Sequence, residues 1–232
     1  MTVSIKLETS NSLAIEYKRL ALTQNPSKLG TIRSDELYSS NIILLLLNAC
    51  IIEGILRTWL TAEIKKDLNK LATERKQTGK NSPSKPEMVA ENYWVKVEHA
   101  GGWQSIISQY RDYMAVKLTS ISGYTSINHL FTLRNVIGHG TSIVIPKYRT
   151  EAPGSDYTDS WQKKLEDVRR YLTSNLSTSN VLDSLSKSEI SKHFWEQSRI
   201  FLDEVAGKFD NEIVQASLAY KSFDRYSFGF RN

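Results

Sequence analysis

The sequence contains little proline, glycine or cysteine. Its 232 residues include 5 prolines and 11 glycines, which cluster between long stretches of regular hydrophobic spacing. Folds with many strands need turn residues at short intervals, so this scarcity favours long helices. The single cysteine, Cys50, excludes an internal disulfide. Because its neighbours along the chain are apolar, we expect a buried structural thiol rather than a reactive one.

Common catalytic signatures are also missing from the sequence. It has no Gly-Lys-Ser/Thr phosphate loop, Gly-x-Ser-x-Gly elbow, His-Glu-x-x-His pair or Cys-x-x-Cys pair. The four histidines and one cysteine are too few to favour a zinc site built from protein ligands. We therefore expect no metal and no cofactor, and we interpret His129 and His193 as ordinary surface or core histidines.

One stretch, 42–60, is apolar enough to be considered as a membrane span. It contains Asn48, Glu53 and Arg57, each of which is costly in hydrocarbon. The sequence therefore favours a buried core helix and no membrane partner. The first ten residues mix charged and polar residues with isolated apolar ones, from which we expect no signal peptide and a cytoplasmic protein.

Hydrophobic spacing predicts an all-α fold. The periodic stretches cover 14–22, 35 to about 77, 103–118, 126–137, 160–175 and 188 to about 220. A polar loop is expected at 78–86 and a short strand-like segment at 141–148. We expect an N-terminal extension over 1–34, a helical core over 35–150, and C-terminal helices over 151–232 packed on the same domain.

The net charge of +5 is concentrated in one segment. Between 57 and 85, eight basic residues stand against three acidic ones, the same excess as in the whole chain. Such a segment can attract a polyanion. The alternative is a solvated helix end that runs into a loop. Its candidate RNA-binding residues are Lys65, Lys66, Lys70, Arg75 and Lys76.

The segment 133–140 brings together three residue types that suit RNA cleavage. When the 2′-hydroxyl of RNA attacks the neighbouring phosphate, the reaction needs a proton acceptor, positive charge and alignment. His139 offers an imidazole, the side chain best suited to proton transfer near neutral pH. Arg134 offers a permanent forked cation for phosphate oxygens. The amide of Asn135 can orient the phosphate or the imidazole, and no metal is required.

The same segment resembles the signature of the HEPN superfamily, an Arg followed by four to six residues and a His, with a polar residue directly after the Arg. Here four residues separate Arg134 from His139, and Asn135 is the polar residue. Leu130, Phe131 and Leu133 form an apolar lead-in, and the stretch 49–57 looks like the first core helix of such domains. The resemblance covers roughly 35–148.

This resemblance implies a HEPN-like helical bundle, with additional helices at the C-terminus. It also implies a metal-independent endoribonuclease whose catalytic residues are Arg134, Asn135 and His139. Family members place the motifs of two protomers face to face, so a homodimer is expected. They act as toxins or antiphage effectors, which implies RNA as substrate and an antitoxin or regulatory protein as a possible partner. In one subgroup a modified Tyr lies two residues after the His, where this chain has Thr141.

Other interpretations of these residues remain open. Arg134 can pair with a core acid such as Glu53, Asn135 can be a polar residue at a helix end, and His139 can satisfy a buried carbonyl. The chain would then be a non-catalytic HEPN module that binds RNA or a partner protein, or a plain dimerisation domain. Residues five apart on a regular helix differ by about 140° in direction. Arg134 and His139 therefore diverge unless Gly138 ends or bends the helix.

The aromatic residues between 220 and 230 have two possible roles. With the basic residues among them, they can stack on RNA bases. Alternatively they pack against the core or against a partner.

Overall fold

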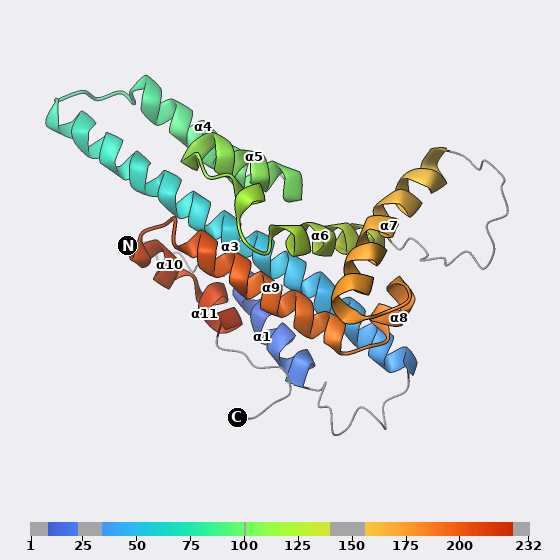
Figure 1. Ribbon diagram of the computed structural model, residues 1–232. Helices are drawn as coiled ribbons and strands as arrows, with labels where there is room; N and C mark the ends of the chain where they lie inside the picture. The colour runs from blue at the N-terminus through green and yellow to red at the C-terminus, as the bar shows by residue number, and fades with distance from the viewer. Residues whose placement is uncertain (1–8, 23–33, 100, 140–155, 225–232) are drawn as a thin grey trace.

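The structure is a computed structural model that describes residues 9–22, 34–99, 101–139 and 156–224. In these residues all regular structure is helical, which confirms the all-α class (Figure 1). The expected strand-like segment at 141–148 lies outside the described residues. The helices are α1 (Thr9–Leu22), α3 (Ser34–Gln77), α4 (Lys85–His99), α5 (Trp103–Met114), the 3-10 turn η1 (Leu118–Ser120), α6 (Tyr124–Gly138), α7 (Asp156–Leu176), α8 (Val181–Leu185), α9 (Glu189–Ala206), α10 (Asn211–Ala216) and α11 (Leu218–Asp224).

Helix α3 is the central element of the bundle. It runs for 44 residues, and the helices α1, α4, α5, α6 and α8 to α11 all contact it (Figure 1). Its apolar stretch is covered on several sides, and its fully buried side chains include Leu44, Leu45, Ile51, Ile55 and Trp59. Each buried side chain of this size contributes about 1.5–3 kcal/mol to stability. The helix predicted over 35–77 is therefore confirmed.

Two buried asparagines tie the apolar part of α3 to the C-terminal helices. Asn41 donates to the carbonyl oxygens of Leu185 and Lys187 at 2.8 and 3.0 Å. Asn48 accepts a hydrogen bond from Ser198 on α9 at 3.1 Å. By length and composition, α3 is the one helix in the described residues that could cross a membrane, and 50% of its most apolar window is buried. The asparagine contacts support the interpretation of this stretch as a core helix, because they lead to neighbouring helices of the same chain.

Helix α4 was not predicted from the sequence, and it begins inside the expected polar loop. Ser84 and Glu87 form a reciprocal capping box at its start. The backbone N–H of Ser84 donates to Glu87 Oε2 at 2.6 Å, and the backbone N–H of Glu87 donates to Ser84 Oγ at 3.4 Å. Arg75, at the end of α3, also donates to Glu87 at 3.0 Å. The Ser-x-x-Glu pattern was the available signal for this helix.

Two predicted helices were too long. The helix expected over 103–118 ends at Met114, because Ala115 adopts a left-handed conformation with φ of 53°. The helix expected over 188–220 is broken after Ala206 into α9, α10 and α11. At this break Phe209 packs against Trp59, with ring centroids 5.7 Å apart. The short helix α8 was also missed, although Asn180 caps its first turn by accepting from the backbone N–H of Asp183 at 2.8 Å.

The two ends of the described chain meet on one side of α3. Helix α1 contacts both α3 and α11 (Figure 1). Tyr17 of α1 lies 5.6 Å from Phe223 of α11 between ring centroids, and Trp59 lies 5.0 Å from Tyr220. Tyr220 and Phe223 therefore pack in the core, whereas the aromatic residues beyond them lie outside the described residues. Cys50 is half-buried, whereas the sequence predicted a buried thiol.

Candidate functional site

Helix α6 carries the motif and lies directly against α3. Its apolar residues face the core, and Leu130, Leu133 and Val136 are fully buried. The helix starts after Gly123, whose φ of 78° suits glycine. A Cβ on this glycine would lie 2.8 Å from the carbonyl oxygen of Gln197 on α9, so the start of α6 is pressed against α9. The prediction of a helix over 126–137 is confirmed.

Arg134 is held between α6 and α3. Its Nη2 lies 3.4 Å from Oε2 of Glu53, and its Nη1 donates to Oδ1 of Asn135 at 3.1 Å. Glu53 also binds Arg57, whose Nη2 and Nε lie 3.1 and 3.3 Å from Oε1. One carboxylate is thus shared by two guanidinium groups, which leaves one positive charge in excess. The side chain of Arg134 remains 31% exposed, so solvent reaches this charge.

The contact with Glu53 is the ion pair that the alternative interpretation of Arg134 predicts. It also fixes the direction of the guanidinium, as an active site would require. Arg57 is held more firmly than Arg134, because its Nη1 also donates to the carbonyl oxygen of Val97 at 2.5 Å. The geometry is therefore compatible with both a structural and a catalytic role for Arg134.

His139 lies immediately after the last residue of α6. Its backbone N–H donates to the carbonyl oxygen of Asn135 at 3.1 Å, whereas its φ and ψ of −84° and 1° lie outside the helical region. Gly138 is thus the last residue of the regular helix. The side chain of His139 is exposed.

Asn135 follows Arg134 directly and shares one side of α6 with His139. Asn128, Thr132, Asn135 and His139 follow one another at steps of four, three and four, so they lie along one side of α6. We call them the polar row. His139 differs from Asn135 by about 40° in direction. Arg134 points elsewhere, but its guanidinium reaches back to the Asn135 amide. The Asn135 amide thus contacts Arg134 and lies on the same side of α6 as His139.

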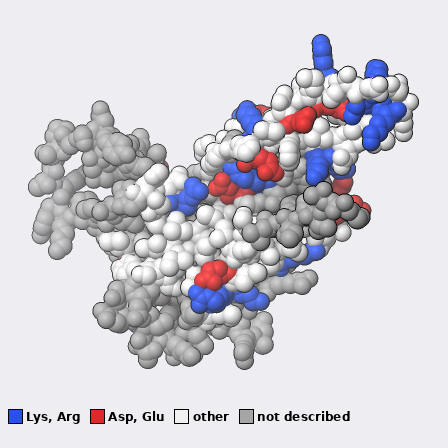
Figure 2. Space-filling model, turned by 180° about the vertical axis from the view of Figure 1, so that it is seen from behind, with Lys and Arg blue, Asp and Glu red and all other residues white. Residues whose placement is uncertain are grey.

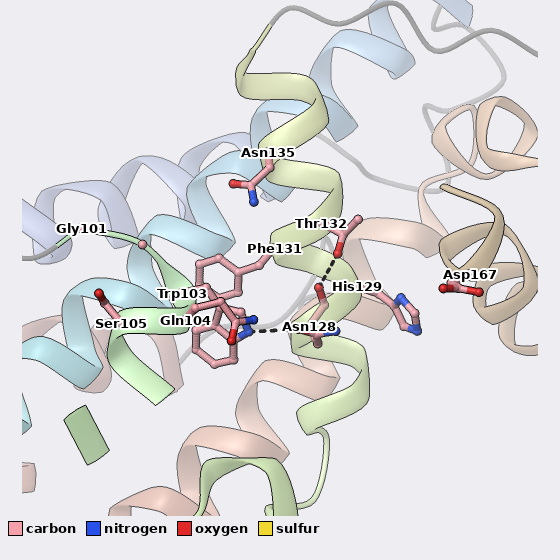
Figure 3. A pocket seen from close by; sticks show the side chains of 11 residues that line it. Gly101, Trp103, Gln104, Ser105, Asn128, His129, Phe131, Thr132, Asn135 and Asp167 are labelled. Carbon is pink, nitrogen blue, oxygen red and sulfur yellow. Dashed lines mark hydrogen bonds between the residues drawn. The ribbon is translucent and has the colours of Figure 1, made fainter. Parts of the chain in front are cut away.

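A pocket of about 550 Å³ lies beside the polar row (Figure 3). The first turn of α5 lines one side, α6 lines another, and Asp167 of α7 stands at its edge. Its floor is a pair of stacked rings, Trp103 and Phe131, with centroids 4.3 Å apart and planes tilted by 5°. The lining residues are Gly101, Gly102, Trp103, Gln104, Ser105, Asn128, His129, Phe131, Thr132, Asn135 and Asp167. The sequence analysis did not identify this pocket.

His129 and His193 belong to a cluster around Tyr171. The ring of His129 lies 4.7 Å from the ring of Tyr171, and Nε2 of His193 lies 2.5 Å from its hydroxyl. The Tyr171 hydroxyl donates to Ser126 at 2.5 Å. Burial lowers the pKa of both imidazoles below 6.5, although Asp167 raises that of His129 and Glu196 raises that of His193. The cluster joins α6, α7 and α9, in agreement with a packing role for both histidines.

The basic residues proposed for RNA binding differ in their surroundings. Lys66 pairs with Glu63 and Asp210, and Arg75 pairs with Glu87. The other three, Lys65, Lys70 and Lys76, are exposed and form no ion pair with any residue that the structure describes. Figure 2 shows Lys and Arg side chains gathered at the end of the α3–α4 hairpin. Lys65 and Lys76 point within about 20° of each other, whereas Lys70 points about 140° from Lys65.

No group of three or more His, Cys, Asp or Glu side chains that could hold a metal ion occurs among the described residues. No protein-family model, curated protein or solved structure matches this chain. Its function is therefore inferred from the motif and from the geometry around it.

Proposed function

We propose that this chain is a metal-independent endoribonuclease of the HEPN type, with Arg134, Asn135 and His139 as catalytic residues. One observation carries the proposal: Arg134 is oriented by Glu53 and Asn135 while it remains partly exposed, and His139 follows on the same side of the helix as Asn135. A guanidinium fixed in direction can stabilise the negative charge of a phosphorane without rearrangement.

The proposed reaction is attack of the 2′-hydroxyl on the adjacent phosphate. His139 takes the proton from the hydroxyl, and the oxygen forms a bond to phosphorus while the bond to the 5′-oxygen of the next nucleotide breaks. Arg134 neutralises charge on the phosphoryl oxygens. The leaving 5′-oxygen takes a proton from water, so the products are a 2′,3′-cyclic phosphate and a 5′-hydroxyl end, and His139 returns its proton to the solvent. The basic segment of α3 would attract the RNA backbone.

The test is cleavage of an unstructured RNA in the presence of EDTA. The full chain should give 2′,3′-cyclic phosphate ends, and His139→Ala should cleave about 10²–10⁴-fold more slowly. Arg134→Lys should also be slow, because an ammonium cannot replace the fork. His99→Ala is the matched control, since His99 is an exposed histidine on another helix. Circular dichroism and thermal melting establish that each variant is folded.

The same proposal includes a homodimer. Arg134 and His139 do not point in the same direction on one α6, so a second copy that faces the first can complete the site. Light scattering should give about twice the chain mass of 26.4 kDa. A monomer that still cleaves RNA would exclude a shared site. A toxin or antiphage role, with an antitoxin or regulatory protein as partner, predicts growth arrest on expression that His139→Ala relieves.

A non-catalytic HEPN module is the alternative, and the ion pair between Arg134 and Glu53 favours it. In that case Arg134 links two helices, and the surface around the polar row binds RNA or a protein. RNA binding without cleavage would support this alternative, whereas equal cleavage by wild type and His139→Ala would exclude His139 as a catalytic residue.

A further inference from the structure

The pocket beside the polar row has an unusual charge for a protein that would act on RNA. Among its lining residues there is one carboxylate, Asp167, and no Lys or Arg. Burial lowers the pKa of His129, so this imidazole is neutral at pH 7. A phosphate in the pocket would face Asp167 without a compensating cation. The pocket is therefore suited to a neutral group rather than to the RNA backbone.

The polar side chains in the pocket retain capacity for further hydrogen bonds. Asn128 accepts from the indole nitrogen of Trp103 at 3.2 Å, and Asn135 accepts from Arg134 at 3.1 Å. In both cases the amide oxygen is used, and the amide nitrogen donates to no residue that the structure describes. Thr132 donates to the carbonyl oxygen of Asn128 at 2.9 Å and can still accept. In Figure 3 Asn135 and Asn128 lie toward Trp103 and Gln104, whereas Thr132 lies nearer His129.

The pocket offers amide donors, a hydroxyl and a carboxylate around an open volume. These groups can form hydrogen bonds with the edge of a planar heterocycle. Proteins that recognise single-stranded RNA bind splayed bases through such edges. The volume of about 550 Å³ is sufficient for one base. The carboxylate of Asp167 can accept from an exocyclic amino group, as acidic residues do from cytosine. Uracil would instead present carbonyl oxygens to it.

We propose that this pocket binds one unpaired RNA base that carries an exocyclic amino group, next to the phosphate held at Arg134. The inference rests on the proposed function, because RNA is the ligand only if the chain is a ribonuclease or an RNA-binding module. Asn135 joins the two places, since its side chain lines the pocket and accepts from Arg134. The phosphate then lies at the positive end of the site and the base at the neutral, acceptor-containing end.

The experiment measures binding without cleavage. Decamers of A, C and U with 2′-fluoro sugars cannot be cleaved, and fluorescence anisotropy gives their affinities for the full chain. The A and C decamers should bind about tenfold more tightly than the U decamer, within the range for one well-placed base contact. Asp167→Asn should remove this preference. Asp167 is exposed, so this substitution leaves the fold intact.

A second variant fills the pocket. Thr132→Phe should weaken binding of the A and C decamers about tenfold, the same cost as the lost base contact. Thr173→Phe on α7 is its control, because Thr173 is an exposed helical threonine that neither lines the pocket nor lies in the basic segment. The control should bind as wild type does. Circular dichroism shows whether either variant has unfolded.

Equal affinity of wild type for the three decamers would overturn the proposal, as would an unchanged preference in Asp167→Asn. Cleavage of ordinary RNA is measured separately. A chain that prefers A and C but cleaves nothing would keep the base pocket and lose the ribonuclease activity. A chain that cleaves RNA without any base preference would support the ribonuclease activity and contradict the base pocket.

Discussion

Nη2 of Arg134 on α6 lies 3.4 Å from Oε2 of Glu53 on α3, across 81 positions of the sequence. The other oxygen of the same carboxylate binds Arg57. The motif helix and the central helix are therefore joined by an ion pair that is only 17% exposed on the Glu53 side. Loss of this carboxylate would leave two guanidinium groups close together.

Glu53→Gln should lower the free energy of unfolding by about 1–3 kcal/mol, the range for hydrogen bonds to charged groups. The amide can accept a hydrogen bond but cannot balance two positive charges. Urea unfolding measures the change. Glu63→Gln is the control, because among the described residues Glu63 forms its ion pair with Lys66 alone, whose side chain is 52% exposed, and its loss should cost less than about 0.5 kcal/mol. Equal effects of the two substitutions would contradict a structural role for Glu53.

The long helices could be predicted from the sequence, whereas the breaks between them could not. The apolar spacing in α3 and α6 continues over several turns, so periodicity alone identifies both helices. Helix α4 buries few apolar residues, among them Val97, and its start depends on the bonds between Ser84 and Glu87. The end of α5 depends on one residue, Ala115, in a left-handed conformation that its side chain does not favour.

The candidate site could be predicted only in part. Arg134, Asn135 and His139 are close in the sequence, so a motif reveals them. An ion pair between Arg134 and Glu53 was one of the interpretations made from the sequence. Its geometry could not be predicted, because the two residues are far apart along the chain. The pocket could not be predicted, because its walls come from segments around 101–105, 128–135 and 167 that only the packing of α5, α6 and α7 brings together.

Substitution of Lys65, Lys70 and Lys76 by Ala should weaken binding of single-stranded RNA and reduce its salt dependence. Each lost phosphate contact lowers the slope of log affinity against log salt by about 0.7, so three contacts lower it by about 2. A triple Ala substitution of Lys18, Lys117 and Lys208 removes the same charge from exposed positions elsewhere. If both triple variants change the slope equally, the basic segment has no special role.

Gly54→Ala should destabilise the protein. A Cβ at this position would lie 2.5 Å from the Cβ of Ser10, so α1 would have to move away from α3. Overpacking of this kind costs about 1–3 kcal/mol, which exceeds the gain of about 1 kcal/mol in helix propensity. Gly138→Ala is the control, because its Cβ would meet nothing within 4 Å. The clash predicts that Ser10→Gly restores part of the melting temperature of Gly54→Ala, and no restoration would refute it.

The histidine cluster predicts a loss of stability in mildly acidic solution. His129 and His193 have pKa values below 6.5 in the folded protein, chiefly because they are buried. In the unfolded chain the pKa of both imidazoles is about 6.5. As the pH falls, the unfolded chain therefore takes up these protons before the folded protein does. Their contribution to stability is therefore complete above pH 6.5 and is lost as the pH falls through the lower, folded values.

Replacement of both histidines by Gln should flatten this dependence. Gln keeps a polar side chain of similar length but does not titrate, so the unfolded chain no longer gains protons at these positions. Urea midpoints at pH 7.5, 6.5 and 5.5 give the comparison. Wild type should lose more stability between pH 6.5 and 5.5 than the double variant. His99→Gln, at an exposed position outside the cluster, should lose as much as wild type. If the double variant and wild type lose equal stability over this interval, His129 and His193 do not couple folding to pH.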